Sequence, residues 1–259
     1  MCTLSWCILP TQYVLFFNRD EQRTRQQAVS PQVFNENGIN IIRPHDPDGG
    51  GTWISTNERG LSLCLLNYYQ GEIPPGKLTS RGLLVKSLSK LRTLAEIDEV
   101  LSRETLNNYA PFSLVVFDFE SLCGSSKHRH SPQLRIWTGD SLQKTDCPLP
   151  FTSSSVKFEE VKAKRVRRFN EDIGESFVLS GDEDGVQIEH VHHLLQAYHT
   201  GHDGTPGYQS VCLHRDDATS VSLSQIDVCA EKVLFQYYDG SPCTLIGQGY
   251  SGRTGLARN

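Results

Sequence analysis

The sequence predicts an α+β fold in which packed sheets carry helices on their outer faces. Runs of β-type residues come in blocks, two pairs of helical segments separate the blocks, and the strict alternation of strand and helix that indicates a doubly wound sheet is absent. At 259 residues, with 37% hydrophobic and 21% charged residues, the chain can bury a large core. Two packed sheets with helical layers outside, or another α+β arrangement, fit this order.

The chain opens on a predicted hairpin. Thr3–Leu9 and Gln12–Asn18 are short β-type runs separated by Pro10-Thr11. The charged stretch Glu21–Arg25 that follows is expected to be solvated. The other predicted strands are Ile39–Ile42, Thr52–Ser55, Gly60–Leu66, Phe112–Phe119, Gln133–Trp137, Tyr208–Arg215, Thr219–Val228 and Lys232–Tyr238.

Four helices are predicted from apolar spacing. Two of them lie between Ser80 and Leu106. Ser155–Phe169 is expected to be a helix capped by one of the serines at 153–155, and its basic run to be a solvated face. Val186–Tyr198 is the fourth. We expect residues 1–246 to form one domain and the glycine-rich residues 247–259 to form a flexible tail.

The overall charge excludes some classes of function. A net charge of −5 and a pI near 6.0 argue against a nucleic-acid partner, because a protein that binds nucleic acid carries a basic face. No apolar run is long enough to cross a bilayer, and residues 1–17 lack the basic start of a signal peptide. We therefore expect a cytoplasmic protein without a transmembrane segment.

The eight cysteines do not form a recognisable metal or redox motif. No C-x-x-C pair is present, which argues against a zinc ribbon or a thioredoxin-like site. In a cytoplasmic protein most cysteines should be reduced and inert. Cys64 and Cys212 lie in apolar runs typical of core strands.

Cys2 stands apart because of its position. Initiator methionine is usually removed when the next side chain is small, and its removal would leave Cys2 with a free α-amine beside its thiol. An α-amine titrates near neutral pH and can take the thiol proton, so one residue would hold a nucleophile and a base. This is the chemistry of an N-terminal nucleophile amidohydrolase. The alternative is that Cys2 is a small buried residue that begins a strand.

Short motifs occur in order along nearly the whole chain. They are Met1-Cys2-Thr3-Leu4, Phe17-Asn18-Arg19-Asp20-Glu21, Gly50-Gly51-Thr52-Trp53, Asn57-x-x-Gly60, Leu66-Asn67-Tyr68, Ser153-Ser154-Ser155 and His214-Arg215-Asp216-Asp217. Together they resemble the NRDE family, also called the transport and Golgi organisation protein 2 family, and the last two resemble its microbial branch. The resemblance implies an αββα sandwich of the N-terminal nucleophile hydrolase type. For eukaryotic members it implies roles in haem trafficking, lipid or acyl-CoA metabolism, or secretory organisation.

A more distant resemblance links the chain to bile-salt hydrolases and penicillin V acylases. These enzymes also begin Met-Cys-Thr and carry an Arg-Asn-x-Asp element on the second strand. Here the order is Asn18-Arg19-Asp20-Glu21. Arg19 and Asp20 either take the same roles with an offset of one residue or do not take them at all.

The Asn18–Glu21 cluster supplies the first candidate partners of Cys2. Arg19 is expected to lower the thiol pKa, Asp20 to position the α-amine, and Asn18 to contact substrate. Side chains alternate along a regular strand, so Arg19 and Asp20 can face the same site only at a bulge or a strand end. The alternative is a structural cluster of salt bridges.

A second group of candidates lies further along the chain. Asn67 is expected to donate its side-chain N–H to an oxyanion, and Tyr68 a backbone N–H. Trp53 is expected to line a pocket, Ser154 to add a polar wall, and Arg215 to bind a substrate carboxylate. The alternatives are a strand-end turn for Asn67, a core position for Trp53 and a helix cap for Ser154. Gly49-Gly50-Gly51 either allows close approach of a ligand or forms a flexible loop.

The histidines at 190, 192, 193, 199 and 202 raise the question of a metal site. Neither H-E-x-x-H nor H-x-x-E-H is present, and His192 and His199 are two helical turns apart. We therefore expect neither a metal nor another cofactor.

Two main hypotheses of function follow. The first is an amidohydrolase that acts on a non-peptide C–N bond of a small amide, with Cys2, Arg19, Asp20 and Asn67 as catalytic residues. The alternative is a non-catalytic carrier or trafficking protein that binds haem or an acyl-lipid or acyl-CoA ligand on the same fold. A third hypothesis is a scaffold protein in which the ancestral active site no longer catalyses a reaction.

Overall fold

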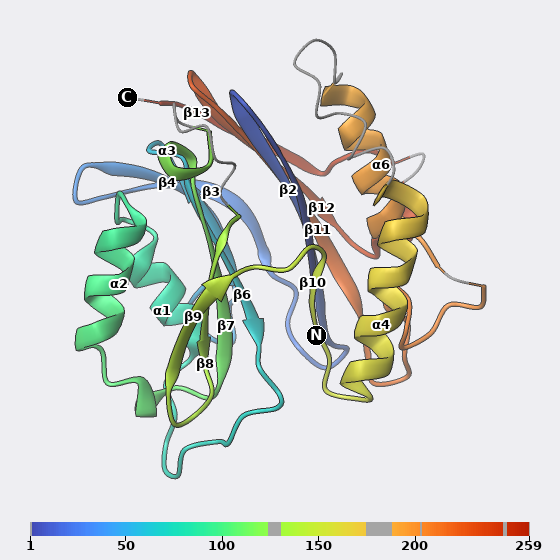
Figure 1. Ribbon diagram of the computed structural model, residues 1–259, viewed down its shortest axis with the longest axis horizontal. Helices are drawn as coiled ribbons and strands as arrows, with labels where there is room; N and C mark the ends of the chain where they lie inside the picture. The colour runs from blue at the N-terminus through green and yellow to red at the C-terminus, as the bar shows by residue number, and fades with distance from the viewer. Residues whose placement is uncertain (1, 124–130, 175–187, 203, 246–247, 259) are drawn as a thin grey trace.

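The computed structural model describes residues 2–123, 131–174, 188–202, 204–245 and 248–258. Its elements form four layers. Helices α1 (Arg81–Leu88) and α2 (Leu94–Arg103) cover one side of a pair of face-to-face sheets, and helices α4 (Phe158–Phe169) and α6 (Ile188–Thr200) cover the other (Figure 1). This is the αββα sandwich of an α+β protein, as the sequence predicts.

The first sheet contains the N-terminal hairpin at its centre. Its strand order is β10-β1-β2-β11-β12-β13, and every pair is antiparallel. Strand β1 therefore has a neighbour on each side, and its first residue lies inside the sheet. The strands are β1 (Cys2–Leu9), β2 (Gln12–Gln22), β10 (Phe151–Ser153), β11 (Ala218–Cys229), β12 (Lys232–Asp239) and β13 (Gly252–Ala257).

The second sheet is a meander whose strands follow one another in chain order. All its pairs are antiparallel, and short connections join most of them. The strands are β3 (Val29–Glu36), β4 (Ile39–His45), β5 (Ile54–Asn57), β6 (Leu61–Asn67), β7 (Phe112–Asp118), β8 (Gln133–Trp137) and β9 (Leu142–Asp146).

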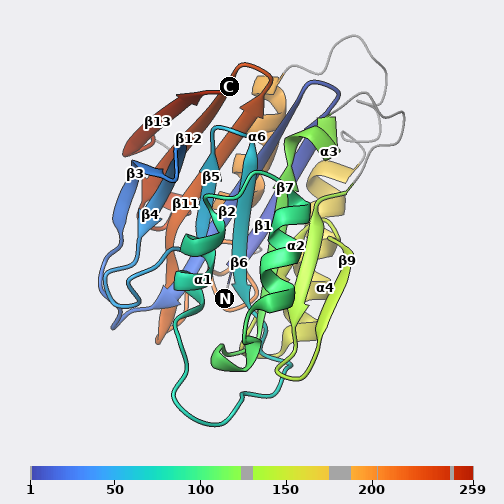
Figure 2. The same cartoon turned by 90° about the vertical axis from the view of Figure 1, so that its left-hand side faces the viewer.

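The helices lie on the outer faces of the two sheets. Helices α1 (Arg81–Leu88) and α2 (Leu94–Arg103) lie over the second sheet (Figure 2). Helices α4 (Phe158–Phe169) and α6 (Ile188–Thr200) lie over the first. Short helical segments complete the chain: α3 (Phe119–Cys123), η1 (Leu106–Asn108), η2 (Asn170–Gly174) and η3 (Pro242–Thr244).

The largest apolar cluster fills the space between the two sheets. Leu4 and Trp6 of β1 point into it, whereas Cys7 packs with the α4 and α6 layer. On β2, Phe17 faces the space between the sheets and Phe16 faces the helices. This alternation places Cys2 and Arg19 on the inter-sheet side, because they have the same parity as Leu4 and Phe17.

Several edge elements differ from the sequence prediction. Strands β3, β9, β10 and β13 are additional, and β13 occupies part of the predicted flexible tail, where it pairs with β12. Strands β3, β9 and β13 are largely exposed, so they lack the alternating apolar pattern that identifies a half-buried strand. Tyr208–Arg215 is not a strand, because buried side chains rather than a neighbouring strand bind its carbonyl groups at 209–211.

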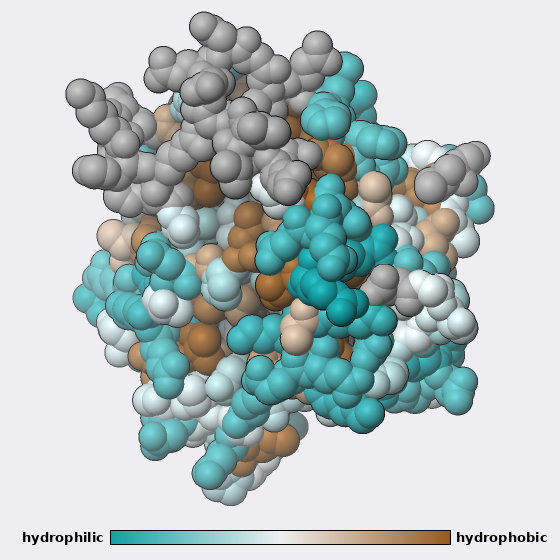
Figure 3. Space-filling model, turned by 45° about the vertical axis from the view of Figure 1, so that its right-hand side comes forward, coloured by the Kyte–Doolittle hydropathy of each residue, from teal (hydrophilic) through white to brown (hydrophobic). Residues whose placement is uncertain are grey.

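Helix α4 begins three residues later than predicted, at Phe158. Its N-cap residue is Lys157, in the left-handed conformation, so no serine caps the helix. Much of the outer face of this layer is hydrophilic, which agrees with a solvated basic run (Figure 3). Arg165 is the exception within that run, because it is buried at 1% exposure. None of the helices in the described part of the chain is long and apolar enough to span a bilayer.

Candidate active site

Cys2 begins β1 between two other strands. Its Cα is paired with Arg19 of β2 on one side and with Ser153 of β10 on the other. The backbone N–H of Cys2 donates to Ser153 Oγ at 3.1 Å. Met1 lies outside the described residues. The predicted nucleophile is therefore held in a regular sheet.

A cavity of about 430 Å³ lies over Cys2. The hairpin contributes Arg19, Asp20 and Glu21 to its wall, and the second sheet contributes Asn67 at the end of β6. Asp46 and Trp53, which follow β4, and the start of α1 complete it. The predicted site residues Cys2, Arg19, Asp20, Trp53 and Asn67 thus meet at one cavity.

The Cys2 thiol is protonated in the chain that retains Met1. Burial is the main cause that raises the pKa of the thiol to about 11, and the carboxylates of Asp20 and Glu21 act in the same direction. The terminal ammonium group and a hydrogen bond from the Asp20 backbone oppose this rise. The expectation that Arg19 lowers the pKa of Cys2 below its usual value is therefore wrong for this form.

Arg19 lies beside Cys2, but its guanidinium also contacts an aromatic ring and two carboxylates. Its guanidinium carbon lies 4.0 Å from the centre of the Trp53 ring, and Nη2 is 3.3 Å from Glu21 Oε2 and 3.8 Å from Asp46 Oδ1. The two carboxylates compensate the guanidinium charge. Trp53 is both a wall of the cavity and part of the inter-sheet core, so the two interpretations of this residue are compatible.

Asp20 follows Arg19 on β2, so its side chain starts from the opposite face of the strand. Its Oδ1 accepts a hydrogen bond from Ser220 Oγ at 2.5 Å, and its Oδ2 lies 3.9 Å from Arg165 Nη2. The register between β2 and β11 shifts between Ser220 and Ser222, opposite Asp20 and Arg19. The extra residue, Val221, belongs to β11, and both Arg19 and Asp20 line the cavity although they alternate along β2.

Arg165 is a site residue that the sequence analysis assigned to a solvated face. Its guanidinium donates to Thr3 Oγ1 at 2.6 Å, to Thr152 Oγ1 at 2.7 Å and to the Ser210 carbonyl at 2.7 Å. Thr152 Oγ1 in turn donates to the carbonyl of Cys2 at 3.0 Å. Arg165 therefore fixes the strand ends around Cys2. The helical period offered a signal, because Val161, Arg165 and Phe169 recur every four residues on the buried face of α4.

Asn67 lines the same cavity as Cys2. Its side-chain amide donates to Tyr69 Oη at 2.8 Å. Tyr68 does not share this role, because its backbone N–H donates to the Pro111 carbonyl at 3.2 Å and the residue is not among those that line the cavity.

Asn18 is a structural residue rather than a substrate contact. Its amide nitrogen donates to the carbonyls of His199 and Val211 at 2.9 and 3.0 Å. Its oxygen must therefore accept from His199 Nδ1, 3.0 Å away, which leaves His199 Nε2 to accept from Ser5 Oγ at 2.7 Å. The side chain is fully buried against α6 because its strand position points away from Cys2.

Ser154 and Arg215 also lie outside the main cavity. Ser154 Oγ bonds within its own turn, to the carbonyl of Val156, while the neighbouring Ser153 contacts Cys2. Arg215 is paired with Asp217 and lines an adjoining cavity of about 290 Å³. The two cavities share Asp20, Glu21, Arg25 and Asn67, so Arg215 faces a continuation of the same hollow.

The glycine run after β4 packs against α1 rather than against a ligand. A Cβ at Gly51 would lie 2.1 Å from the backbone carbon of Gly82, and a Cβ at Gly49 would lie 2.9 Å from Ser80 Oγ. This close packing places Ser80, Arg81 and Gly82, the first residues of α1, in the cavity wall. Within the described part of the chain, the Arg81 guanidinium makes no ion pair and donates to the Pro111 carbonyl at 2.8 Å.

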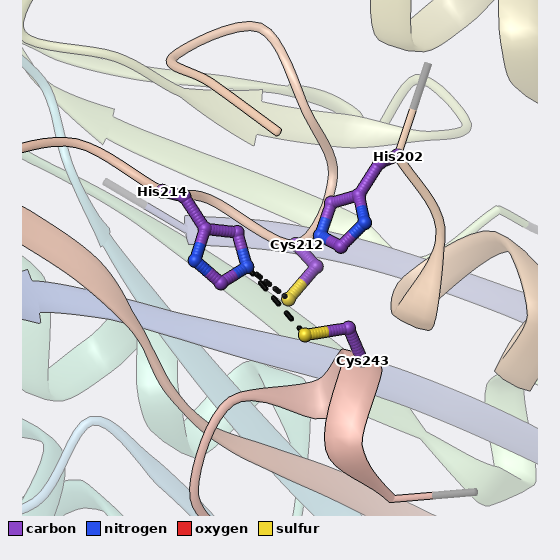
Figure 4. Close-up of side chains that lie close together, drawn as sticks. All are labelled: His202, Cys212, His214 and Cys243. Carbon is purple, nitrogen blue, oxygen red and sulfur yellow. Dashed lines mark hydrogen bonds between the residues drawn. The ribbon is translucent and has the colours of Figure 1, made fainter. Parts of the chain in front are cut away.

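The histidine side chains of α6 do not converge on one site. His199 is buried, and burial together with the charge of Arg165 lowers its pKa to about 3. His192 pairs with Asp227. His202 instead lies with residues from distant segments, namely Cys212, His214 and Cys243 (Figure 4). This is a set of metal-ligating groups that the spacing of the histidines alone does not reveal.

The family model described as transport and Golgi organisation 2 matches residues 1–247. None of the curated proteins with which the sequence was compared is recognisably related to it. Solved structures share the fold at low identity. Penicillin V acylase from Agrobacterium tumefaciens is 11% identical with a TM-score of 0.56, over 92% of this chain and 86% of that one.

Two further solved structures are similar. The C2A mutant of conjugated bile acid hydrolase from Clostridium perfringens is 12% identical with a TM-score of 0.53, over 99% of this chain and 92% of that one. The N-acylethanolamine-hydrolyzing acid amidase ortholog from Caenorhabditis elegans is 10% identical with a TM-score of 0.53, over 87% and 92%. At such identities the likeness establishes the N-terminal nucleophile hydrolase fold.

Proposed function

The chain belongs to the transport and Golgi organisation 2 family, and we propose that it is an N-terminal-cysteine amidohydrolase that cleaves a non-peptide C–N amide bond once Met1 has been removed. One observation carries this proposal: Cys2, from the first sheet, and Asn67, from the second, line a single cavity together with Arg19 and Asp20. A nucleophile and an amide donor that line one cavity can both reach the carbonyl of a bound substrate.

The reaction uses groups of this chain alone. The α-amine of Cys2 takes the thiol proton, and Sγ attacks the carbonyl carbon of the amide. The carbonyl oxygen becomes an oxyanion, to which the Asn67 amide donates. The C–N bond then breaks, and the leaving amine takes the proton from the α-ammonium group. Water hydrolyses the thioester, which releases a carboxylic acid and restores the thiol.

Asp20 and Ser153 position the attacking residue. Ser153 Oγ already accepts from the Cys2 nitrogen, and Asp20 brings a carboxylate near the same end of β1. In the processed chain these two oxygens are the acceptors available to an α-ammonium group at that position. They orient the α-amine toward the thiol instead of taking part in bond formation.

The cavity wall favours a substrate with an anionic group. Arg81 is a guanidinium without a carboxylate partner among the described residues, and it lies at the start of α1, where the helix dipole is positive. An amide whose acyl or amine part carries a carboxylate, sulfonate or phosphate matches this wall. Six charged side chains line the cavity, which makes it a poor match for haem or a long acyl chain and disfavours the carrier hypothesis.

The test begins with a peptide map after brief labelling with a limiting thiol-acylating probe near neutral pH. Cys2→Ala removes the nucleophile, and Cys229→Ala is the matched control, since Cys229 is half-buried and distant from the cavity. We expect a chain without Met1 that is acylated at Cys2, with labelling lost only in Cys2→Ala. A retained Met1, or a Cys2 no more reactive than Cys229, would refute the proposal.

A second step identifies the substrate class. Release of primary amine is measured with a panel of N-acylated amino acids, N-acylated taurine and matched neutral amides. Turnover of the anionic members that Cys2→Ala abolishes supports both the reaction and the assignment of Arg81. Turnover of the neutral amides alone would contradict the role of Arg81 and leave the reaction intact.

A further inference from the structure

Four metal-ligating side chains from three separate segments lie close together. His202 follows the C-terminal end of α6, Cys212 and His214 lie in the segment before β11, and Cys243 lies in η3 (Figure 4). Their ligand atoms all lie within 4.8 Å of one another. Cys243 is 29 residues from His214, so the fold brings η3 to the other three side chains.

The distances match those of a tetrahedral ion site. Zinc binds thiolate at about 2.3 Å and imidazole at about 2.0–2.1 Å, and a tetrahedron with these bonds separates S and N by about 3.5 Å. His214 Nε2 lies 3.5 Å from Cys212 Sγ and 3.5 Å from Cys243 Sγ. Two of the six edges of such a tetrahedron thus already have the required length.

His202 completes the set. Its ring centre lies 4.9 Å from that of His214, and its Nε2 is buried without a hydrogen-bond partner among the described residues. A buried ring nitrogen without a partner is costly. A cation between the two imidazoles and the two thiols would give this nitrogen a partner.

We propose that His202, Cys212, His214 and Cys243 bind one Zn²⁺ ion in a structural site. Two sulfur and two nitrogen ligands suit zinc, and a set of four protein ligands leaves no open position for a substrate. The ion would cross-link the end of α6, the segment before β11 and η3. This assignment replaces the expectation that the chain holds no metal, and it does not depend on the proposed hydrolase activity.

The segment Tyr208–Arg215 also contacts residues that hold the candidate active site in place. The carbonyl of Ser210 accepts from Arg165, and that of Val211 accepts from Asn18. The N–H of Leu213 donates to Ser220 Oγ, which in turn bonds Asp20. Tyr208–Arg215 is not a strand and pairs with β11 through an isolated bridge between His214 and Thr219, so a bound ion would help to hold the segment in place.

The direct test measures metal in the full-length protein. The protein is expressed with zinc in the medium, freed of any histidine tag, desalted and assayed by elemental mass spectrometry. We expect one zinc ion per chain in the wild type and in Cys2→Ala. Cys243→Ser and His214→Asn should lose the ion, whereas Cys229→Ser, the control at a half-buried cysteine outside the cluster, should retain it.

Cobalt provides a spectroscopic readout that does not depend on folding yield. Co²⁺ added to chelator-treated wild type should give the visible bands of a tetrahedral ion and thiolate charge-transfer absorption, both absent in Cys243→Ser. A wild type that binds neither ion overturns the proposal. So does a protein whose intact mass is two hydrogens low, with a Cys212–Cys243 disulfide peptide in its map, because the two thiols would then form a redox pair.

Discussion

The guanidinium of Arg165 and the carboxylate of Asp20 lie 3.9 Å apart, and both side chains are fully buried. Arg165 comes from a helix on the outer face of the first sheet and Asp20 from the strand beside Cys2. Burial raises the pKa of Asp20, while Arg165 and the hydrogen bond from Ser220 oppose that rise. The helix layer therefore supplies the charge that keeps a carboxylate next to the nucleophile.

This pair predicts a large and non-additive effect on stability. Arg165→Met should lower the free energy of unfolding by about 3–5 kcal/mol, because it removes the guanidinium charge that stabilises the buried carboxylate of Asp20. Adding Asp20→Asn should restore part of that loss, since the carboxylate is then gone. Urea unfolding of the two single variants and the double variant gives the coupling. Strictly additive losses would contradict a direct interaction between the two side chains.

The reactivity of Cys2 should depend on whether Met1 is present. With Met1 the thiol pKa is about 11, so the rate of alkylation should keep rising with pH up to that value. Without Met1 the α-amine lies beside the thiol, and the rate should level off at lower pH. The measurement is the alkylation rate of Cys2 against pH, by mass spectrometry, in a chain that begins at Cys2 and in one with an extra N-terminal residue. Identical profiles would contradict the role of the α-amine.

The central part of the fold could be predicted from the sequence because buried strands alternate in a simple way. The N-terminal hairpin, the strand that ends at Asn67, and the paired β11 and β12 all have clear apolar patterns. The edge strands β3 and β13 have exposed polar positions and could not be distinguished from loops. The motif Asn57-x-x-Gly60 proves to be structural, since the Asn57 amide donates to the carbonyls of Ser89 and Leu91.

The residues that line the cavity were predictable where they begin or follow an apolar strand. Cys2, Arg19, Asp20 and Asn67 could be identified because each follows or begins an apolar strand. Arg165 was missed because the basic run around it indicates a solvated face, although its four-residue spacing from Val161 and Phe169 was a signal of burial. The cluster at His202 and Cys212 could not be identified, since its members lie on segments that only tertiary folding brings together.

Replacing Asn67 should slow acylation of Cys2 without preventing substrate binding. Asn67→Ala should lower kcat by about 10²–10³-fold, the usual cost of losing one oxyanion donor. Tyr69→Phe is the control, because it removes the present hydrogen-bond partner of the Asn67 amide and leaves the amide in place. Single-turnover release of amine measures the acylation step. An unchanged kcat in Asn67→Ala would assign Asn67 to the strand-end turn alone.

Arg81 should govern recognition of the anionic group rather than the chemical step. Arg81→Gln is expected to raise KM for an anionic amide by roughly 10–100-fold, as for the loss of a charge-assisted hydrogen bond, while kcat changes little. Arg103→Gln, at an exposed arginine at the end of α2, is the control. Steady-state kinetics with one anionic amide and its neutral analogue make the comparison. An equal rise in KM for both substrates would contradict charge recognition.

His199 should make the protein less stable in mild acid. Its native pKa is lowered from 6.5 to about 3, first by burial and then by Arg165, so between these values the unfolded state binds a proton that the folded state does not. The free energy of unfolding should therefore fall as pH drops below 6.5, and this residue accounts for about 2 kcal/mol between pH 7 and pH 5. Full stability from this source is present only above pH 6.5.

The test compares the pH dependence of wild type with that of His199→Gln, which cannot take up the proton and can still accept a hydrogen bond from Ser5. His193→Gln, on the same helix but not buried, serves as the control. Urea unfolding at pH 7 and pH 5 should show a loss in wild type that is larger than in His199→Gln by about 2 kcal/mol. Equal losses would mean that His199 is protonated in the folded protein, and the hydrogen bond from Ser5 to a neutral Nε2 would then be wrong.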